Sequence, residues 1–219
     1  STATEPEFLD THKQLIGSAY ILHINGRHRQ LMRSAMAVAK EVGTIISLDG
    51  GAQRYDEDMK PITEASHIVI VARDYAEKYT GTTNLEDACR IIHERGACIA
   101  GVTDGANGSY FVWPDGTFYR CEPFTQATVV DTTGAGDSFH GAFLANLVHT
   151  INHMMGQDTT STTKHDRASI HAVELLKACA HSDLEKAAIF ASAVASLNTQ
   201  GIGGRSPLPT LKSVQELIG

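Results

Sequence analysis

The stretch "DTTGAGD" at residues 131–137 brings two glycines and an aspartate to the start of a helix expected over residues 136–149. A turn that runs directly into a helix leaves the first backbone N–H groups without partners inside the helix, and the helix dipole adds partial positive charge there. Glycine also lets the backbone approach a ligand closely. Gly134, Ala135 and Gly136 therefore predict a site for an anion such as a phosphate.

Asp137 follows these glycines in the first turn of the same helix, where the dipole favours its ionised form. A carboxylate beside an anion site can accept the proton of an attacking hydroxyl, while N–H groups stabilise the charge on a transferred phosphoryl group. The structural alternative is that the glycines only make a tight turn and that Asp137 only caps the helix. The seven residues by themselves leave both interpretations open.

Strands and helices alternate along the first half of the chain, which is the pattern of a largely parallel sheet covered on both faces. Apolar runs predict strands at residues 18–24, 44–49, 67–72 and 97–103. Helical spacing of apolar residues predicts helices at 27–43, 57–65 and 84–95, with Gly43 ending the first and Asn84 opening the last. In such layered α/β folds, ligands bind where the parallel strands end.

The pattern changes after residue 103. The turn sequences "DGANG" and "PDG" flank short β-type runs at residues 109–113 and 117–121, which predict antiparallel strands at one sheet edge. Further helices are expected at residues 136–149, 167–180, 183–198 and 210–218. Between them, residues 156–166 are polar and of low complexity, and we expect a mobile surface insertion there.

The composition is typical of a soluble, acidic protein. With 219 residues, 42% of them hydrophobic and 20% charged, the chain suits one domain spanning 1–219. The formal net charge of -7 argues against nucleic acid or an acidic membrane as a partner, and no stretch approaches the ~18 apolar residues of a membrane span. The four cysteines form no CxxC pair, which indicates reduced thiols and a cytoplasmic location.

A longer match surrounds the glycine-rich turn. The segment "VVDTTGAGDSFHGAFLANL" closely resembles the carboxy-terminal signature of the ribokinase-like (PfkB) family of sugar and nucleoside kinases. The segment "VTDGANGSY" resembles the strand and turn under the nucleotide in that family, and "QGIGGRSPLP" is similar to its adenine-side loop. The resemblance covers roughly residues 18–211 with its motifs in the family's order. It implies the ribokinase-like layered α/β/α fold and ATP-dependent phosphoryl transfer to a sugar hydroxyl, with Mg²⁺.

The resemblance also implies roles for particular residues. Asp137 matches the catalytic base, the turn from Gly134 to Gly136 matches the anion hole, and the nucleotide loop is matched by Thr103, Gly105 and Gly108. Asp131 and Thr133 match positions that bind a monovalent cation, such as K⁺, in many members. For these two residues, an equal alternative to cation binding is a local turn in which the side chain forms a hydrogen bond with the backbone. The implied partners are a sugar and ATP, and a homodimer stays open.

Some positions depart from the family's common pattern. Many members carry Asn-x-x-Glu, which organises magnesium and phosphate, where this chain has Ala72 and Tyr75. The ketohexokinase-like members also lack that pair, and "HINGRH" and "LDGG" resemble the ketohexokinase and sulfofructose-kinase side of the family, which favours a ketose-type sugar. Arg27, just past an expected strand end, is a candidate contact for an oxyanion on the sugar, or else a surface arginine.

Two other functions compete with an active sugar kinase. Family members are usually roughly a hundred residues longer, within ordinary α/β domain sizes, and the resemblance implies that their amino-terminal strands, sugar contacts and lid are missing from this chain. A non-catalytic nucleotide-binding fragment or pseudokinase is therefore the main alternative. The second is a GDS-type esterase with Ser138 as nucleophile, which lacks the expected Asp-x-x-His after that serine.

Overall fold

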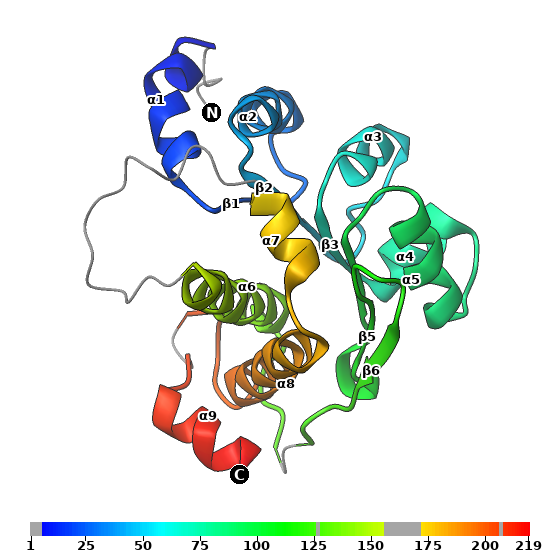
Figure 1. The fold of residues 1–219 in the computed structure, drawn as a ribbon. Helices are drawn as coiled ribbons and strands as arrows, with labels where there is room; N and C mark the ends of the chain where they lie inside the picture. Colours follow the sequence, from blue (N-terminus) through cyan, green and yellow to red (C-terminus); the bar gives the residue numbers. More distant parts are fainter. Residues whose placement is uncertain (1–5, 126–127, 156–171, 206–207) are drawn as a thin grey trace.

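The structure is a computed structural model that describes residues 6–125, 128–155, 172–205 and 208–219. In these residues one six-stranded sheet runs in the order β1-β2-β3-β4-β5-β6, so each strand pairs with the next one along the chain (Figure 1). The expected insertion at residues 156–166 and the beginning of the helix expected at 167–180 lie outside the described residues.

The first four strands are parallel, as the alternating pattern predicts. They are β1 (Ile21–Ile24), β2 (Ile45–Gly50), β3 (Ile68–Ala72) and β4 (Ile99–Thr103). All residues of β2 are buried, because helices cover both faces of a parallel sheet. The register pairs Ile24 with Leu48 and Ala72 with Thr103, which brings the carboxyl ends of the strands to one edge.

The last two strands, β5 (Ser109–Val112) and β6 (Phe118–Cys121), are antiparallel, which confirms the expected change of topology. The short 3-10 helix η2 (Gly105–Asn107) turns the chain from β4 into β5. Gly108 closes this turn with a φ of 92°, and a Cβ at that position would lie 2.3 Å from the Cys121 carbonyl oxygen. Glycine is thus required where β5 begins beside the end of β6.

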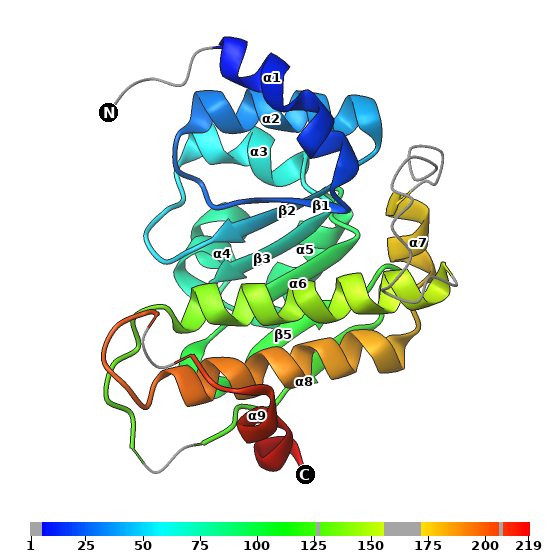
Figure 2. The same ribbon diagram turned by 90° about the vertical axis from the view of Figure 1, so that its left-hand side faces the viewer.

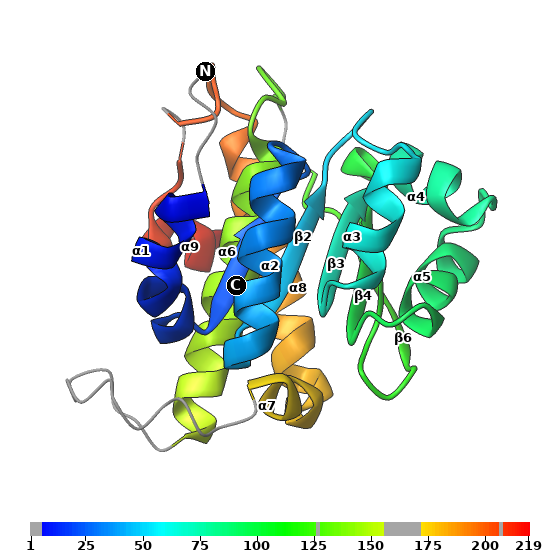
Figure 3. The same cartoon turned by 90° about the horizontal axis from the view of Figure 1, so that it is seen from above.

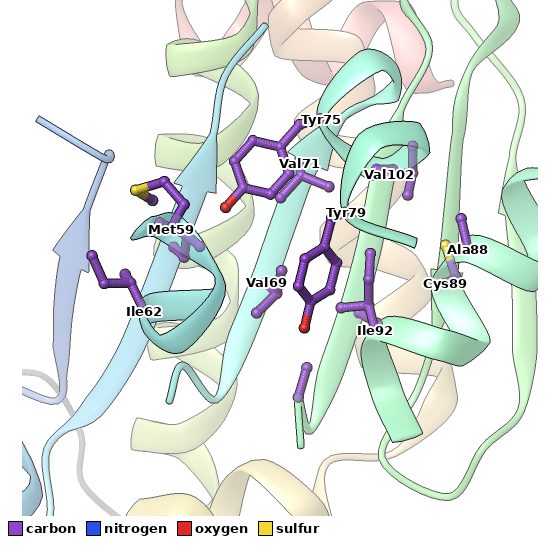
Figure 4. Close-up of a cluster of buried hydrophobic side chains, with 14 of the residues drawn as sticks. Met59, Ile62, Val69, Val71, Tyr75, Tyr79, Ala88, Cys89, Ile92 and Val102 are labelled. Atoms are coloured by element: carbon purple, nitrogen blue, oxygen red, sulfur yellow. The ribbon is translucent and has the colours of Figure 1, made fainter. Parts of the chain in front are cut away.

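Helices in the described residues cover one face of the sheet, and the first of them packs on the second. They are α1 (Pro6–Ser18), α2 (Arg29–Val42), α3 (Lys60–Glu64), α4 (Arg73–Thr80) and α5 (Leu85–Glu94), with a 3-10 turn η1 (Glu57–Met59) before α3. Gly43 ends α2 with a φ of 77°, and the Asn84 side chain accepts from the N–H groups of Glu86 and Asp87, as expected of these two residues. Helices α1 and α4 were not expected. Figure 4 shows the apolar cluster that α3, α4 and α5 bury against the sheet.

The opposite face is covered by α6 (Ala135–Met154), α7 (Ala172–Ala178) and α8 (His181–Asn198), with α9 (Leu211–Ile218) packed on α8. Helices α6 and α8 lie side by side across the sheet (Figures 2 and 3). Phe143 of α6 is fully buried and stacks on Phe111 of β5, with ring centroids 5.7 Å apart, and Phe111 stacks on Trp113. This aromatic stack ties α6 to the antiparallel strands.

No helix in the part of the chain that the structure describes is long and apolar enough to cross a membrane. All four cysteines are free, as expected, and burial raises the pKa of each thiol.

Phe143→Ala should destabilise the protein by about 3–5 kcal/mol, because it leaves a cavity in the aromatic stack under α6. Urea denaturation followed by circular dichroism measures this change. His149→Ala, on the exposed side of the same helix, is the control and should change the unfolding free energy by less than about 0.5 kcal/mol. Equal effects of the two substitutions would contradict the assignment of Phe143 to the core.

Candidate active site

The start of α6 is fixed by close contact between two glycine backbones. Gly134 is the N-cap of α6, with a φ of 81°, and its carbonyl oxygen accepts from Ser138 N–H at 2.8 Å. A Cβ on Gly134 would lie 2.5 Å from the Gly204 Cα atom. Both the positive φ and this approach exclude a side chain. The turn predicted from the sequence therefore needs glycine at this position in order to fold, whether or not it binds a ligand.

The N–H groups of the turn are not all free. The Ala135 N–H donates to the Thr132 carbonyl oxygen at 3.2 Å, whereas the described residues supply no backbone acceptor to the N–H groups of Gly136 and Asp137. A Cβ built on Gly136 meets no atom within 4 Å, so open space lies in front of this residue. Free donors beside open space at a helix start fit an anion such as a phosphate.

Asp131 connects this turn to the loop that follows α8. Its Oδ1 accepts from the Thr133 N–H and its Oδ2 from the Gly203 N–H, both at 2.8 Å, and these bonds lower the pKa of Asp131. Asn198, buried at the end of α8, donates to the Thr133 carbonyl oxygen at 3.3 Å. Asp131 thus makes the local turn that the sequence left open, and a cation role for Asp131 and Thr133 stays a prediction.

Asp137 is exposed, and α6 begins at the edge where the parallel strands end (Figure 2). Two residues of neighbouring strands lie within reach of its charge. Burial lowers the pKa of His23 on β1, and the charge on Asp137 opposes this shift. The pKa of Asp49 on β2 is raised, with the charge on Arg54 acting against the shift and the charge on Asp137 adding to it. Asp49 is only 5% exposed, and burial is the larger cause that raises its pKa to about 6. The predicted base therefore has a second, buried carboxyl group as a neighbour.

Two further residues contact this buried carboxyl group. The His140 Nε2 atom lies 3.3 Å from Asp49 Oδ1, and the Arg54 Nη1 atom lies 3.8 Å from Asp49 Oδ2. Arg54 also donates to the Asn25 carbonyl oxygen at 3.1 Å, which places its guanidinium over the end of β1. None of Asp49, Arg54 and His140 was predicted as a site residue, although "LDGG" and "DSFHGAF" contain two of them.

The predicted nucleotide loop lies at the end of β4. Thr103 is the last residue of β4, and the Asp104 N–H donates to the Gly108 carbonyl oxygen at 2.9 Å, which closes the loop around Gly105. Asp104 also accepts from Arg73 at the start of α4, at 2.9 Å. Gly105 has a φ of 54°, so the loop uses glycine where other residues are strained.

The remaining predicted site residues lie outside the turn before α6 and the loop after β4. Arg27 is exposed in the loop after β1, where its backbone N–H donates to Asn25 Oδ1 at 3.3 Å. Ala72 is the N-cap of α4. Tyr75 is fully buried, with its hydroxyl 2.7 Å from Thr63 Oγ1, and Figure 4 shows it within the apolar cluster. Neither Ala72 nor Tyr75 therefore offers the oxygen ligands that Mg²⁺ prefers.

No group of three or more His, Cys, Asp or Glu side chains that could hold a metal ion occurs among the described residues. Ser138, the candidate nucleophile of the esterase alternative, is buried on α6.

Comparison with known proteins identifies the family. The model of the pfkB family carbohydrate kinases matches residues 1–211. The chain belongs to this family. The match includes α1, so it begins earlier than the resemblance found in the sequence, which covers roughly residues 18–211. The sequence is 26% identical over 190 residues to a bifunctional ribokinase/ribose-5-phosphate isomerase A of Fructilactobacillus sanfranciscensis, covering 84% of this chain and 29% of that protein.

A second relative is "Probable fructokinase-5" of Arabidopsis thaliana, 27% identical over 225 residues, which cover 95% of this chain and 61% of that protein. The chain thus spans less than two thirds of these curated relatives. Ribokinases and fructokinases both occur among the matches, and the ketohexokinase side of the family stays a prediction.

Solved structures confirm the ribokinase-like fold. The ribokinase of Giardia lamblia aligns with a TM-score of 0.75 at 16% identity, over 97% of this chain and 64% of that one. The Arabidopsis thaliana ribokinase complexed with ribose and ATP aligns with a TM-score of 0.69 at 23% identity, over 95% and 59%. The fructokinase of Vibrio cholerae, in its fructose, ADP and calcium ion bound form, gives 0.68 at 19% identity, over 92% and 61%.

The two glycines of the turn should respond differently to substitution. Gly134→Ala should destabilise the protein by about 1–3 kcal/mol, because its Cβ meets the Gly204 backbone at a positive φ. Gly136→Val should instead leave the melting temperature nearly unchanged and weaken ATP binding, because its side chain projects into the open space beside the free N–H groups.

Thermal denaturation and isothermal titration with ATP separate the two effects. Gly141→Val is the matched control, since a Cβ at Gly141 on the same helix also meets no atom within 4 Å. ATP affinity that is equally unchanged in Gly136→Val and Gly141→Val would show that the turn is purely structural.

Proposed function

We propose that the chain is the nucleotide-binding and phosphoryl-transferring part of an ATP-dependent sugar kinase, with Asp137 as general base and Gly134–Gly136 as anion hole. The observation that carries this proposal is the start of α6. There the free N–H groups of Gly136 and Asp137 border open space, and the Asp137 carboxylate is exposed in the same turn. Membership of the pfkB carbohydrate kinase family supports sugar kinase activity in general.

The proposed reaction uses these groups in one step. The sugar hydroxyl oxygen attacks the γ-phosphorus of ATP, the bond from that phosphorus to the bridging oxygen of ADP breaks, and Asp137 takes the hydroxyl proton. The N–H groups of Gly136 and Asp137 stabilise the charge on the transferred phosphoryl oxygens. Because these donors are held by the contact of Gly134 with Gly204, the anion hole needs no rearrangement when the reaction occurs.

The nucleotide is proposed to bind along the ends of the strands, on the loop of Thr103, Gly105 and Gly108. We propose that this loop and the turn before α6 bind one ATP molecule together. The ribokinase from Arabidopsis thaliana, which shares the fold and is complexed with ribose and ATP, supports this proposal. Mg²⁺ would supply counter-charge to the phosphates. Because Ala72 and Tyr75 lack suitable oxygens, the Mg²⁺ ion would be held mainly by the phosphates and water.

The substrate is proposed to be a sugar, with a ketose favoured by the sequence and by the fructokinase among the relatives. Arg27 remains the proposed contact for an oxyanion on that sugar, with its exposed side chain free to reach a ligand near the end of β1. We also propose a cytoplasmic enzyme, as its cysteines indicate, and the acidic composition favours small molecules over nucleic acid as its partners. A homodimer also stays a prediction.

The second candidate is a nucleotide-binding protein without turnover. It is favoured by the lack of oxygen ligands for Mg²⁺ at Ala72 and at the buried Tyr75. ATP binding in titration calorimetry, without sugar-dependent ADP release across a panel of sugars, would select this candidate.

Asp137→Asn should lower sugar-dependent ADP release by ~10² or more while leaving the Kd for ATP within a few fold, because the variant keeps the N–H groups and loses the base. A coupled assay and ATP titration measure the two quantities. Asp183→Asn is the control, since Asp183 also lies in the first turn of a helix but pairs with Lys186 away from the strand ends. Near-normal turnover of Asp137→Asn would refute the base assignment.

K⁺ should raise the rate of ADP release relative to tetramethylammonium at equal ionic strength, because Asp131 and Thr133 match the family's monovalent-cation positions. Asp131→Asn should lose this stimulation and Asp183→Asn should keep it. Equal rates of the unsubstituted protein in the two salts would remove the cation site.

A further inference from the structure

The loop at residues 51–56, which follows β2, carries Arg54 back over the ends of the first two strands. Gly51 makes room for this path, because a Cβ built on it would lie 3.0 Å from both Cζ and Nε of Arg54. The Arg54 N–H donates to the Gly51 carbonyl oxygen at 3.2 Å, which closes the turn. Figure 2 shows this loop at the same edge of the sheet as the start of α6. The guanidinium group of Arg54 therefore lies at the edge where ligands of layered α/β folds bind.

The backbone of this loop is strained next to Arg54. Gln53 has a φ of 61°, which residues other than glycine rarely adopt. Its N–H donates to Asp74 Oδ2 at 2.7 Å, and on the other side Tyr55 packs edge-on against Tyr75, with ring centroids 5.1 Å apart. These contacts hold the loop in a conformation of higher energy, which proteins keep mostly at functional sites. They fix the direction in which Arg54 leaves the backbone.

The guanidinium group of Arg54 is only partly used by the protein itself. Its Nη1 donates to the Asn25 carbonyl oxygen at 3.1 Å and lies 3.8 Å from Asp49 Oδ2, which is too far for a hydrogen bond. The part of the chain that the structure describes supplies no acceptor to Nε or Nη2, and the side chain is 29% exposed. A planar cation with free donors fits an oxyanion, which accepts two parallel N–H groups at once.

The neighbouring arginines differ from Arg54 in their surroundings. Arg29, at the start of α2, forms ion pairs with Asp56 and Asp58, so its charge is neutralised within the protein. Arg27 is exposed in the loop after β1. Arg54 combines a charge that a ligand can use with a side chain that is already held in place.

A series of contacts connects Arg54 with the helix that carries the proposed base. Asp49 Oδ2 faces Arg54, and Asp49 Oδ1 lies 3.3 Å from the Nε2 atom of His140 on α6. His140 follows Asp137 by three residues, which is about one helical turn. Asp49 is buried, so a ligand at this edge meets the guanidinium group rather than the carboxyl group beneath it. A sugar held at Asp137 thus lies beside the strand ends that Arg54 covers.

We propose that Arg54 determines substrate specificity by binding an oxyanion on the acceptor sugar, such as a carboxylate or a phosphate ester. The inference rests on the proposed function, and it restricts the sugar to an anionic one. The acceptor hydroxyl lies at Asp137, and Nε and Nη2 of Arg54 bind two oxygens of the anionic group at the strand ends. Arg27 adds a second positive charge from the adjacent loop. Because Arg54 is fixed before the ligand arrives, binding costs little ordering of this side chain.

Equilibrium binding of matched ketoses tests this specificity without turnover. D-fructose is neutral, 2-keto-D-gluconate has a carboxylate in the same skeleton, and D-fructose 6-phosphate has a phosphate ester. Isothermal titration calorimetry with a non-hydrolysable ATP analogue present measures the Kd of each sugar. At least one anionic ketose should bind about tenfold or more tighter than fructose, and the tighter of the two identifies the oxyanion. Binding of both anionic ketoses no tighter than fructose, or no binding of any of the three, would overturn the proposal.

Arg54→Gln should weaken binding of the preferred anionic ketose by about 10- to 100-fold and should change the Kd of fructose less than about threefold. Arg29→Gln is the matched control, since it removes the same charge from the same edge but breaks the ion pairs with Asp56 and Asp58. This control should leave the preference for the anionic ketose within about threefold. Equal losses in the two variants would assign the preference to the total charge of the edge and contradict the proposal.

A double variant keeps the test decisive if Arg54→Gln is unstable because it leaves Asp49 without a cation. Asp49→Asn removes the buried charge, so Asp49→Asn combined with Arg54→Gln should fold and should still lack the preference. Asp49→Asn alone should bind the anionic ketose at least as tightly as the unsubstituted protein, because a negative charge beneath the guanidinium group is gone. Loss of the preference in Asp49→Asn alone would assign it to the carboxyl group and overturn the proposal.

Binding and turnover together separate this inference from the proposed function. An Arg54-dependent preference for an anionic ketose, without sugar-dependent ADP release, would support the inference and contradict the proposed function. ADP release with fructose, at a kcat/KM equal to or above that of both anionic ketoses, would support the proposed function and overturn the inference.

Discussion

The contact of the Gly134 backbone with Gly204 is the constraint on which the proposed site depends. It can form because Gly134 has no side chain, and the bond of Asp131 to the Gly203 N–H holds the same two loops together. These loops are far apart in sequence, so the start of α6 is placed by tertiary contact rather than by local propensity. The free N–H groups are therefore oriented before any ligand arrives, which is the form of preorganisation that electrostatic catalysis requires.

Helix α6 connects the chemistry of the strand edge to the core. Its first turn carries Asp137, its next turn carries His140 against Asp49, and Phe143 then enters the aromatic stack with Phe111. The rigidity of the buried part limits rotation of the helix about its axis, because such a rotation would separate stacked rings. The orientation of Asp137 toward β1 and β2 is thus a consequence of packing in the middle of the helix.

Much of the fold could be predicted because its signals are local. Buried β-type runs separated by helices with clear ends, such as Gly43 and Asn84, specify a parallel sheet, and turn glycines specify the antiparallel edge. Helix α4 was missed because its buried face consists largely of Tyr75 and Tyr79, whose polar hydroxyls obscure the apolar pattern. The turn before α6 could be found from the sequence, whereas the contact of Asp49 with His140 joins residues far apart in the chain and has no local signal.

The order of the sheet has a consequence for synthesis on the ribosome. Because each strand pairs with the next one along the chain, the sheet can form one strand at a time as the strands leave the ribosomal exit tunnel. Its two faces are covered at different times: α2, α3, α4 and α5 emerge between the strands, but α6 and α8 follow the last of them. The face bearing Ile45, Ile68 and Ile70 therefore stays exposed until α6 and α8 have been synthesised, and over that interval the nascent chain is open to aggregation.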